Sequence, residues 1–341
     1  MLLNALVYGW YGEGVRNIGD SLFCKAFAHL FPHINFKFVK LIERADVERA
    51  DIIIFGGGSF LYAPIHVKNI ENPIELLATK KIFYMGVGVE TDIHPMHRAL
   101  MKVAGLIATR TIGGTIKLKS ITDAKILEIP DLAYALEDQV NLSPTINAKS
   151  ILIMTNAELL PRWHDIHWKH ASWNYFKSEF SQFLDSLRES KYTVTFASMC
   201  SNAKLHDLGA AAEISNQMKH RDFNTQLYDL PDDFSTLTNV ISQYEIIISQ
   251  RFHGAILANM CKRPCVVIAH HDKLKNATDS CVTVPYYGIS KQNLSDAVLN
   301  CKTMDILPIK LDIFEDVRGT VYSHLGAECP NILVSKMEKS K

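Results

Sequence analysis

The chain has 341 residues, of which 48% are hydrophobic and 21% are charged, and its 36 basic side chains balance 36 acidic ones. This composition excludes a disordered protein, and the length suits two globular domains better than one. A net charge of zero argues against a general nucleic-acid binder, so an anionic substrate would have to be held by a few local cations.

In the first part of the chain, short apolar runs alternate with amphipathic stretches. The pattern predicts strands at 2–8, 51–55, 81–85, 105–109 and 126–129, and helices at 21–31 and 97–104. A polar stretch at 137–149 then interrupts the rhythm, and we place a domain boundary there.

The same rhythm returns in the second part. It predicts strands at 151–154, 192–197, 246–248 and 265–269, and helices at 173–190, 203–218, 232–243 and 252–260. The strand at 265–269 closes this set, and 311–325 reads as a terminal helix. Apolar strands between helices indicate parallel sheets covered on both faces. We therefore predict two Rossmann-like α/β domains, at 1–140 and 141–310, followed by a helix and tail at 311–341.

Ligands of such sheets bind beyond the carboxyl ends of the strands, where a first motif lies at 12–20. Its glycines let a backbone approach a ligand, and the amide of Asn17 can both donate and accept. The motif lacks the third glycine of the dinucleotide fingerprint, which argues against an NAD site. We expect Asn17 to contact a ligand and Asp20 to cap the following helix.

Further motifs follow strands of the first domain. Their loop residues are Gly56, Gly57, Gly58, Ser59, Gly88 and Glu90. The glycines suit either a close ligand or a structural turn. Glu90 would accept a hydrogen bond from a sugar hydroxyl, or be a solvated loop carboxylate. Arg110 directly follows a strand, where a guanidinium can bind a phosphate or carboxylate.

The motif richest in chemistry joins the strand at 246–248 to the next helix and reads Ser-Gln-Arg251-Phe-His253-Gly. Arg251 can neutralise an anion, and His253 can exchange a proton near neutral pH unless it is a structural histidine. Lys273 follows the next strand and would meet the same anion, or lie in a solvated loop.

Two spacings only superficially resemble metal motifs. They are Cys261-x3-Cys265 and His164-x2-His167-x2-His170. The first lacks a second ligand pair, and the second drifts around a helix, so we predict no metal site.

The sequence also bears on location. No run approaches the ~20 apolar residues that span a bilayer, and the start of the chain lacks the basic segment of a secretory signal. The seven scattered cysteines suit reduced thiols, so we expect a cytoplasmic protein.

Taken in order, these motifs make residues 4–290 similar to the polysaccharide pyruvyl transferases. The motifs that carry this similarity are Gly9…Asn17-Ile-Gly19-Asp20, Asp51-Ile-Ile-Ile-Phe-Gly56-Gly57-Gly58-Ser59, Gly86-Val-Gly88, Pro130-Asp131-Leu-Ala and Ser249-Gln-Arg251-Phe-His253-Gly. Phe252 stands where the family more often has leucine, and Arg110 lacks the acidic residue and serine that usually follow it.

The resemblance implies a GT-B-like fold whose two domains face a central cleft, with the acceptor half in the first domain and the donor site in the second. It implies phosphoenolpyruvate as donor, no other cofactor, and a pyruvate ketal on a sugar of a bacterial-type capsule, exopolysaccharide or cell-wall polymer. By position, His253 would be the catalytic acid/base, and Arg251, Arg110 and Lys273 would bind the donor anion together with Asn17.

The residue types suit this chemistry independently. Phosphoenolpyruvate carries a carboxylate and a phosphate of about −1.5 to −2 charge, which two or three cations can hold. The resemblance admits a lipid-linked or nucleotide-linked saccharide as acceptor and a peripheral association with the inner face of the cytoplasmic membrane. We expect no nucleic-acid partner.

Two alternatives stay open. A GT-B glycosyltransferase that uses a nucleotide sugar would need the same cleft and the same arginine and histidine. A non-catalytic saccharide-binding subunit would share the fold, although it would have no use for Asn17, Arg251, His253 and Lys273 together.

Overall fold

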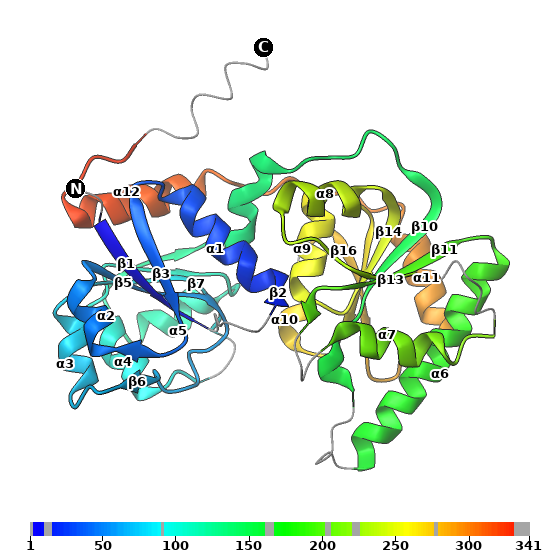
Figure 1. Cartoon of the computed structure of the whole chain (residues 1–341), viewed down its shortest axis with the longest axis horizontal. Coiled ribbons are helices and arrows are strands. Elements are labelled where there is room, and N and C mark those ends of the chain that lie inside the picture. Colours follow the sequence, from blue (N-terminus) through cyan, green and yellow to red (C-terminus); the bar gives the residue numbers. More distant parts are fainter. Residues whose placement is uncertain are drawn as a thin grey trace. The chain divides into compact units, whose positions relative to one another are not determined.

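The protein is described from a computed structural model, shown in Figure 1, which covers residues 3–9, 16–89, 92–160, 167–201, 206–219, 226–275 and 279–330. The chain forms two compact units. The first unit comprises Met1–Gly12, Phe23–Ala135 and Ile309–Lys341, and the second comprises Glu13–Leu22 and Leu136–Pro308.

The first unit is built on a six-stranded parallel sheet with the order β3-β1-β5-β7-β8-β9. Its strands are β1 (Leu3–Tyr8), β3 (Ile34–Val39), β5 (Ile52–Gly58), β7 (Lys81–Val87), β8 (Leu106–Thr109) and β9 (Lys125–Glu128). Its helices are α2 (Arg44–Arg49), α3 (Pro73–Ala78), α4 (Pro95–Met101), α5 (Gly114–Lys119) and α12 (Ile313–Leu325). A short parallel pair joins β4 (Ile42–Glu43) to β6 (Val67–Lys68). Helix α1 (Ile18–Leu30) belongs to the second unit up to Leu22 and to the first from Phe23 onward.

The second unit has its own six-stranded parallel sheet, in the order β13-β11-β10-β14-β15-β16. Its strands are β10 (Asn147–Met154), β11 (Thr193–Ser198), β13 (Gln226–Asp229), β14 (Tyr244–Ser249), β15 (Cys265–Ala269) and β16 (Cys281–Pro285). Its helices are α6 (His167–Glu189), α7 (Asp207–Ser215), α8 (Phe234–Ser242), α9 (Phe252–Met260), α10 (Asp272–Lys275) and α11 (Lys291–Cys301), with a 3-10 turn at Ala157–Leu159. A second 3-10 segment, Leu132–Gln139, spans the boundary between the two units. An antiparallel pair of β2 (Arg16–Asn17) with β12 (Cys200–Ser201) fixes the approach to α1.

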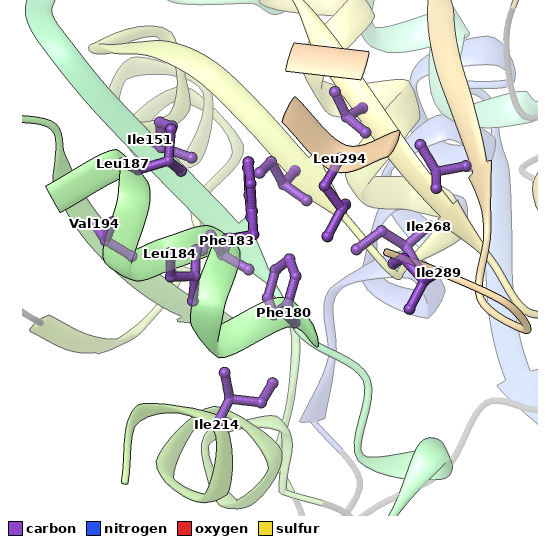
Figure 2. Close-up of a cluster of buried hydrophobic side chains, with 14 of the residues drawn as sticks. Ile151, Phe180, Phe183, Leu184, Leu187, Val194, Ile214, Ile268, Ile289 and Leu294 are labelled. Carbon is purple, nitrogen blue, oxygen red and sulfur yellow. The ribbon is translucent and has the colours of Figure 1, made fainter. Parts of the chain in front are cut away.

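One face of the second sheet packs against α6, α7 and α11 around a large apolar core. The rings of α6 follow one another along its buried side, with centroids 5.6 Å apart for Trp173 and Phe176 and 5.2 Å apart for Phe176 and Phe180. Figure 2 shows Phe180, Phe183 and other α6 side chains directed at the strands. This close packing makes the sheet a firm base for the loops at its edge.

The two parallel α/β sheets that the sequence predicted are confirmed. The expectation that the strand at 265–269 closes the set is wrong, because β16 extends the sheet and α11 covers it. Only one residue of β16, Val284, is buried, so this edge strand lacks the continuous apolar run that marks its neighbours. None of the helices in the described ranges has the length and apolarity that crossing a bilayer requires.

Candidate active site

The order of the second sheet reverses between β10 and β14, and ligands of open α/β sheets bind beyond the carboxyl ends of the strands at such a point. Two hydrogen bonds tie the loops after these strands together. The Gln250 N–H donates to the Met154 carbonyl at 2.9 Å, and Gln250 Oε1 accepts from the Asn156 N–H at 2.9 Å. The predicted arginine–histidine motif therefore lies at this edge, where α9 begins at Phe252.

Arg251 occupies the N-cap position of α9, and its backbone is held by Ser249. The hydroxyl of Ser249 accepts from the Arg251 N–H at 3.1 Å and donates to the Arg251 carbonyl at 2.8 Å. The guanidinium forms an ion pair with Asp207, and its Nη1 lies 3.5 Å from Glu158 Oε1. Burial works against the charge, but the Asp207 carboxylate outweighs it and raises the pKa of Arg251. The cation is therefore permanent and fixed in place.

Asp207 is a residue of the candidate site that the sequence did not reveal. Its side chain is fully buried, and besides Arg251 it accepts hydrogen bonds from the N–H groups of Ala157 at 3.0 Å, Met199 at 3.1 Å and Cys200 at 2.9 Å. One carboxylate thus joins Arg251 to the loops after β10 and β11. Asp207 lies inside the helix predicted at 203–218, and nothing in the sequence there indicated this role.

His253 lies in the first turn of α9 and packs against Gly19 in the first turn of α1. A methyl group on Gly19 would lie 2.2 Å from Nδ1 of the imidazole, so only glycine leaves room for this ring. The Ile18 N–H donates to the Met199 carbonyl at 2.9 Å and holds the start of α1 in the second unit. The imidazole therefore has a packed, defined position at the sheet edge.

Asn17, and not Asp20, caps the start of α1. Asn17 Oδ1 accepts from the Gly19 N–H at 3.1 Å, the role that the sequence predicted for Asp20, and contact of Asn17 with a ligand stays a prediction. Burial raises the pKa of the Asp20 carboxyl to about 6, and nearby His253 is the strongest influence that lowers it. A hydrogen bond with Asn17 and the charges of Arg251 and Lys273 lower it further. Asp20 thus faces the cations of the site.

The loop after β15 brings His270, His271 and Lys273 to the same edge. Burial and the neighbouring His271 lower the pKa of His270 to about 4, and burial and Lys273 lower the pKa of His271. Nε2 of His270 lies 3.2 Å from Nδ2 of Asn156. Both imidazoles are therefore neutral hydrogen-bonding groups near pH 7.

Among the described residues, Glu158, His270 and His271 could hold a metal ion, because their ligand atoms lie within 4.8 Å of one another. Arg251 and Lys273 act on the same carboxylate: although burial opposes them, they lower the pKa of Glu158. These two cations would repel a metal ion and favour an anion. His164 of the predicted histidine series lies outside the described residues.

The first unit contains the other predicted cation, Arg110, at the carboxyl end of β8. Its Nη1 lies 2.6 Å from Asp131 Oδ2, and its Nη2 donates to Ser59 Oγ at 3.1 Å. The side chain of Arg110 is 7% exposed and that of Asp131 is 2% exposed. Asp131 also accepts from the Ala133 N–H at 3.0 Å. Sequence reasoning did not assign Asp131 a role, although it stands in one of the quoted family motifs.

The glycine loop of β5 is set by its backbone. Gly57 and Gly58 have φ of 71° and 133°, which disfavour other residues, and a methyl group on Gly56 would lie 2.7 Å from the Phe27 ring. The Gly88 N–H donates to the Gly58 carbonyl at 3.0 Å, so the two predicted loops are joined. Glu90 lies outside the described residues.

Comparison with solved structures finds the same fold in sugar-nucleotide enzymes. MnaA of S. aureus, solved with UDP, has a TM-score of 0.59 at 11% identity and covers 96% of this chain and 99% of its own. The UDP-GlcNAc 2-epimerase of Neisseria meningitidis, bound to UDP-GlcNAc, has a TM-score of 0.57 at 11% identity, with 94% and 99% covered. That of Methanocaldococcus jannaschii has 0.55 at 10%, with 94% and 100% covered. These likenesses show the GT-B-like fold.

A search of curated proteins found no match. The family model described as polysaccharide pyruvyl transferase matches residues 17–272, a span that runs from Asn17 through the arginine–histidine motif to the loop after β15. That span contains both sheet edges described above. The chain belongs to the polysaccharide pyruvyl transferase family.

Proposed function

We propose that this chain transfers the pyruvyl group of phosphoenolpyruvate to two hydroxyls of one saccharide and releases phosphate, with His253 as acid/base. One arrangement supports this above all. At the switch point of the second sheet, the pKa of Asp20 is lowered by the charges of three side chains, His253, Arg251 and Lys273. An imidazole beside two cations suits proton transfer to a bound anion.

Arg251 and Lys273 would bind the donor anion. Asp207 accepts from Nε and Nη2 of Arg251, whereas Nη1 lies 3.5 Å from the nearest oxygen of Glu158. An oxygen of phosphoenolpyruvate would take the place of Glu158 at Nη1 and gain a charge-assisted hydrogen bond. Lys273, at the start of α10, would supply the second positive charge.

For Arg110 a role in donor binding stays a prediction. Asp131 and Ser59 already accept from its two terminal nitrogens, at 2.6 and 3.1 Å. A donor anion would have to displace one of them or use another N–H of the guanidinium, which has five. A supporting role, in which Asp131 and Arg110 hold the loop with Ser59, needs no such exchange.

The chemistry starts with a proton. Imidazolium at His253 would protonate the methylene carbon of phosphoenolpyruvate, which leaves positive charge on the adjacent carbon. One acceptor hydroxyl attacks that carbon, the second attacks as the bond to phosphate breaks, and the pyruvate ketal is complete. The two hydroxyl protons balance the methyl proton gained and the proton carried by the released phosphate.

His253→Ala should abolish turnover and keep the fold, because it removes the proton donor. His33→Ala, at an exposed site in the first unit, is the matched control and should leave the rate unchanged. Phosphate release with a panel of nucleotide-linked and lipid-linked sugars measures turnover, and mass spectrometry detects the gain of one pyruvate less one water. Turnover by His253→Ala at the rate of the unmodified protein would contradict the assignment of His253 as the acid/base.

A nucleotide-sugar glycosyltransferase is the second candidate, because the structural neighbours hold UDP or UDP-GlcNAc. A thermal shift assay separates the two. Stabilisation by phosphoenolpyruvate supports pyruvyl transfer, and stabilisation by a nucleotide sugar alone supports glycosyl transfer. Stabilisation by both would fit a nucleotide-linked acceptor.

We place the reaction in the cytoplasm. The seven scattered cysteines suit a compartment that keeps thiols reduced. A lipid-linked acceptor would bring the protein to the inner face of the cytoplasmic membrane. Sedimentation with vesicles that carry such an acceptor, against vesicles without it, tests this association.

A further inference from the structure

Two helix starts meet at the candidate active site. Gly19, in the first turn of α1, leaves no room for a side chain beside Nδ1 of His253 in the first turn of α9. The strand pair of β2 with β12 and the hydrogen bond from Ile18 to Met199 hold α1 in this position. Asp20 follows Gly19 directly, and its carboxyl senses the charge of His253.

Asp20 is half-buried, and its carboxyl lies among cationic and polar groups. The groups that face it come from four elements and are His253 and Arg251 at the start of α9, Lys273 of α10, Asn17 of β2 and the Cys200 thiol of β12. Burial outweighs the cations and raises the pKa of Asp20 to about 6. Near neutral pH this carboxyl can therefore both take up and release a proton.

We propose that Asp20 is a second proton-transfer residue of this site and accepts the proton of the attacking acceptor hydroxyl, while His253 supplies the proton to the donor carbon. The inference rests on the proposed function. Closing a ketal removes protons from two hydroxyls, whereas the donor carbon takes up one. After His253 has given up its proton it can take one hydroxyl proton, and the released phosphate carries away the other. Asp20 would accept that other proton from the attacking hydroxyl and pass it to the phosphate.

The proton balance closes with two groups. His253 gives its proton to the methylene carbon as the first hydroxyl oxygen bonds to the adjacent carbon and loses its proton to Asp20. The second hydroxyl oxygen then bonds to the same carbon, its proton returns to His253, and the carbon–oxygen bond to phosphate breaks. The proton on Asp20 passes to the departing phosphate, and both residues regain their initial states.

Asp20→Asn tests the catalytic part. It should lower kcat by about 100-fold or more, because the amide cannot accept a proton, and leave the KM for phosphoenolpyruvate within a few fold. Asp20→Glu should recover part of kcat, and its acidic limb in the pH–rate profile should persist. Asp296→Asn, on α11, is the control, since Asp296 only accepts from Gln292 at 2.9 Å. A kcat for Asp20→Asn equal to that of the unmodified protein, with the acidic limb intact, would overturn the proposal.

A measurement without turnover separates this inference from the proposed function. Carbon-13 NMR of labelled aspartate carboxyls, with Asp20 assigned through Asp20→Asn, should show a titration near pH 6. In His253→Ala the pKa of Asp20 should rise, because a cation that lowers it is lost. If no pyruvyl transfer is found but this shift appears, the pair stands and the proposed reaction fails. If the Asp20 carboxyl titrates near pH 4 and its pKa is the same in His253→Ala, the proposed interaction of Asp20 with His253 is refuted.

Discussion

At the scale of single residues, the site depends on a glycine at position 19. At position 19 only glycine fits against the imidazole of His253, because a methyl group there would lie 2.2 Å from Nδ1. The glycine is therefore explained by the ring it contacts in another segment of the chain. A helix start by itself does not require glycine at this place.

Gly19→Ala should displace the imidazole and lower kcat by about 100-fold, since a shift of about 1 Å at a reacting group has that effect. Overpacking should cost roughly 1–3 kcal/mol of stability. Gly209→Ala in α7 is the matched control, because its methyl group would meet Leu160 Cδ1 at an ordinary 3.8 Å. Steady-state kinetics and urea unfolding give the two quantities, and an unchanged kcat would show that the ring position is unimportant.

The sequence predicted some residues of the site and could not predict others. Arg251 and His253 are adjacent to a strand end in one short motif, so their place at the edge followed from the order of elements. Asp207 and Asp20 act through partners that are far away in the chain, and a sequence alone does not show such pairs. For this reason the sequence predicts a cap at Asp20, a role that Asn17 fills.

At the scale of elements, Asp207 connects three loops of the second unit. Its carboxylate accepts from Ala157 after β10, from Met199 and Cys200 after β11, and from Arg251 after β14. The strands alone would leave these loops free to vary. The buried carboxylate makes their positions depend on one another.

Asp207→Asn should destabilise the protein by roughly 3–5 kcal/mol, because it leaves the buried Arg251 charge without its partner and offers one acceptor oxygen in place of two. Asp229→Asn is the comparison. Asp229 pairs with Arg16 at 3.4 Å and is 46% exposed, so its loss should cost less than about 1 kcal/mol. Denaturant unfolding measures both. Equal losses in the two variants would contradict the role of Asp207.

Element prediction followed the apolar runs and failed where they were absent. Strands β5, β14 and β15 are almost continuously buried and were found from their composition. The edge strand β16, with one buried residue, was missed, as was β3 at the edge of the first sheet. Edge strands face solvent on one side, and their sequences therefore resemble loops.

At the scale of the whole molecule, the last described helix packs within the first unit. Arg318 of α12 is 1% exposed, donates to the Leu30 carbonyl at 2.9 Å and pairs with Glu315 at 2.7 Å. The same guanidinium also donates to the carbonyl of Pro330. It therefore satisfies the end of α1, where backbone carbonyls lack helical partners.

Arg318→Ala should destabilise the first unit by roughly 2–4 kcal/mol, because it leaves the carbonyl of Leu30 and the carboxylate of Glu315 without their donor. Arg44→Ala is the control. Arg44 pairs with Glu48 one helical turn away, and both side chains are exposed, so losing this pair should lower the free energy of unfolding by less than about 0.5 kcal/mol. Hydrogen exchange across both units locates the effect. Protection lost in the second unit alone would be the contrary result.

The place of α12 bears on how the protein is made. A ribosome releases all of the second unit, up to Pro308, before residues 309 onward emerge. Residues 23–135 leave the tunnel earlier, but their unit cannot complete its folding until α12 is made. During translation the face of their sheet that α12 covers therefore stays exposed. The unit that is synthesised first is thus completed second, and a nascent chain stalled near residue 308 should recruit chaperones to its early half.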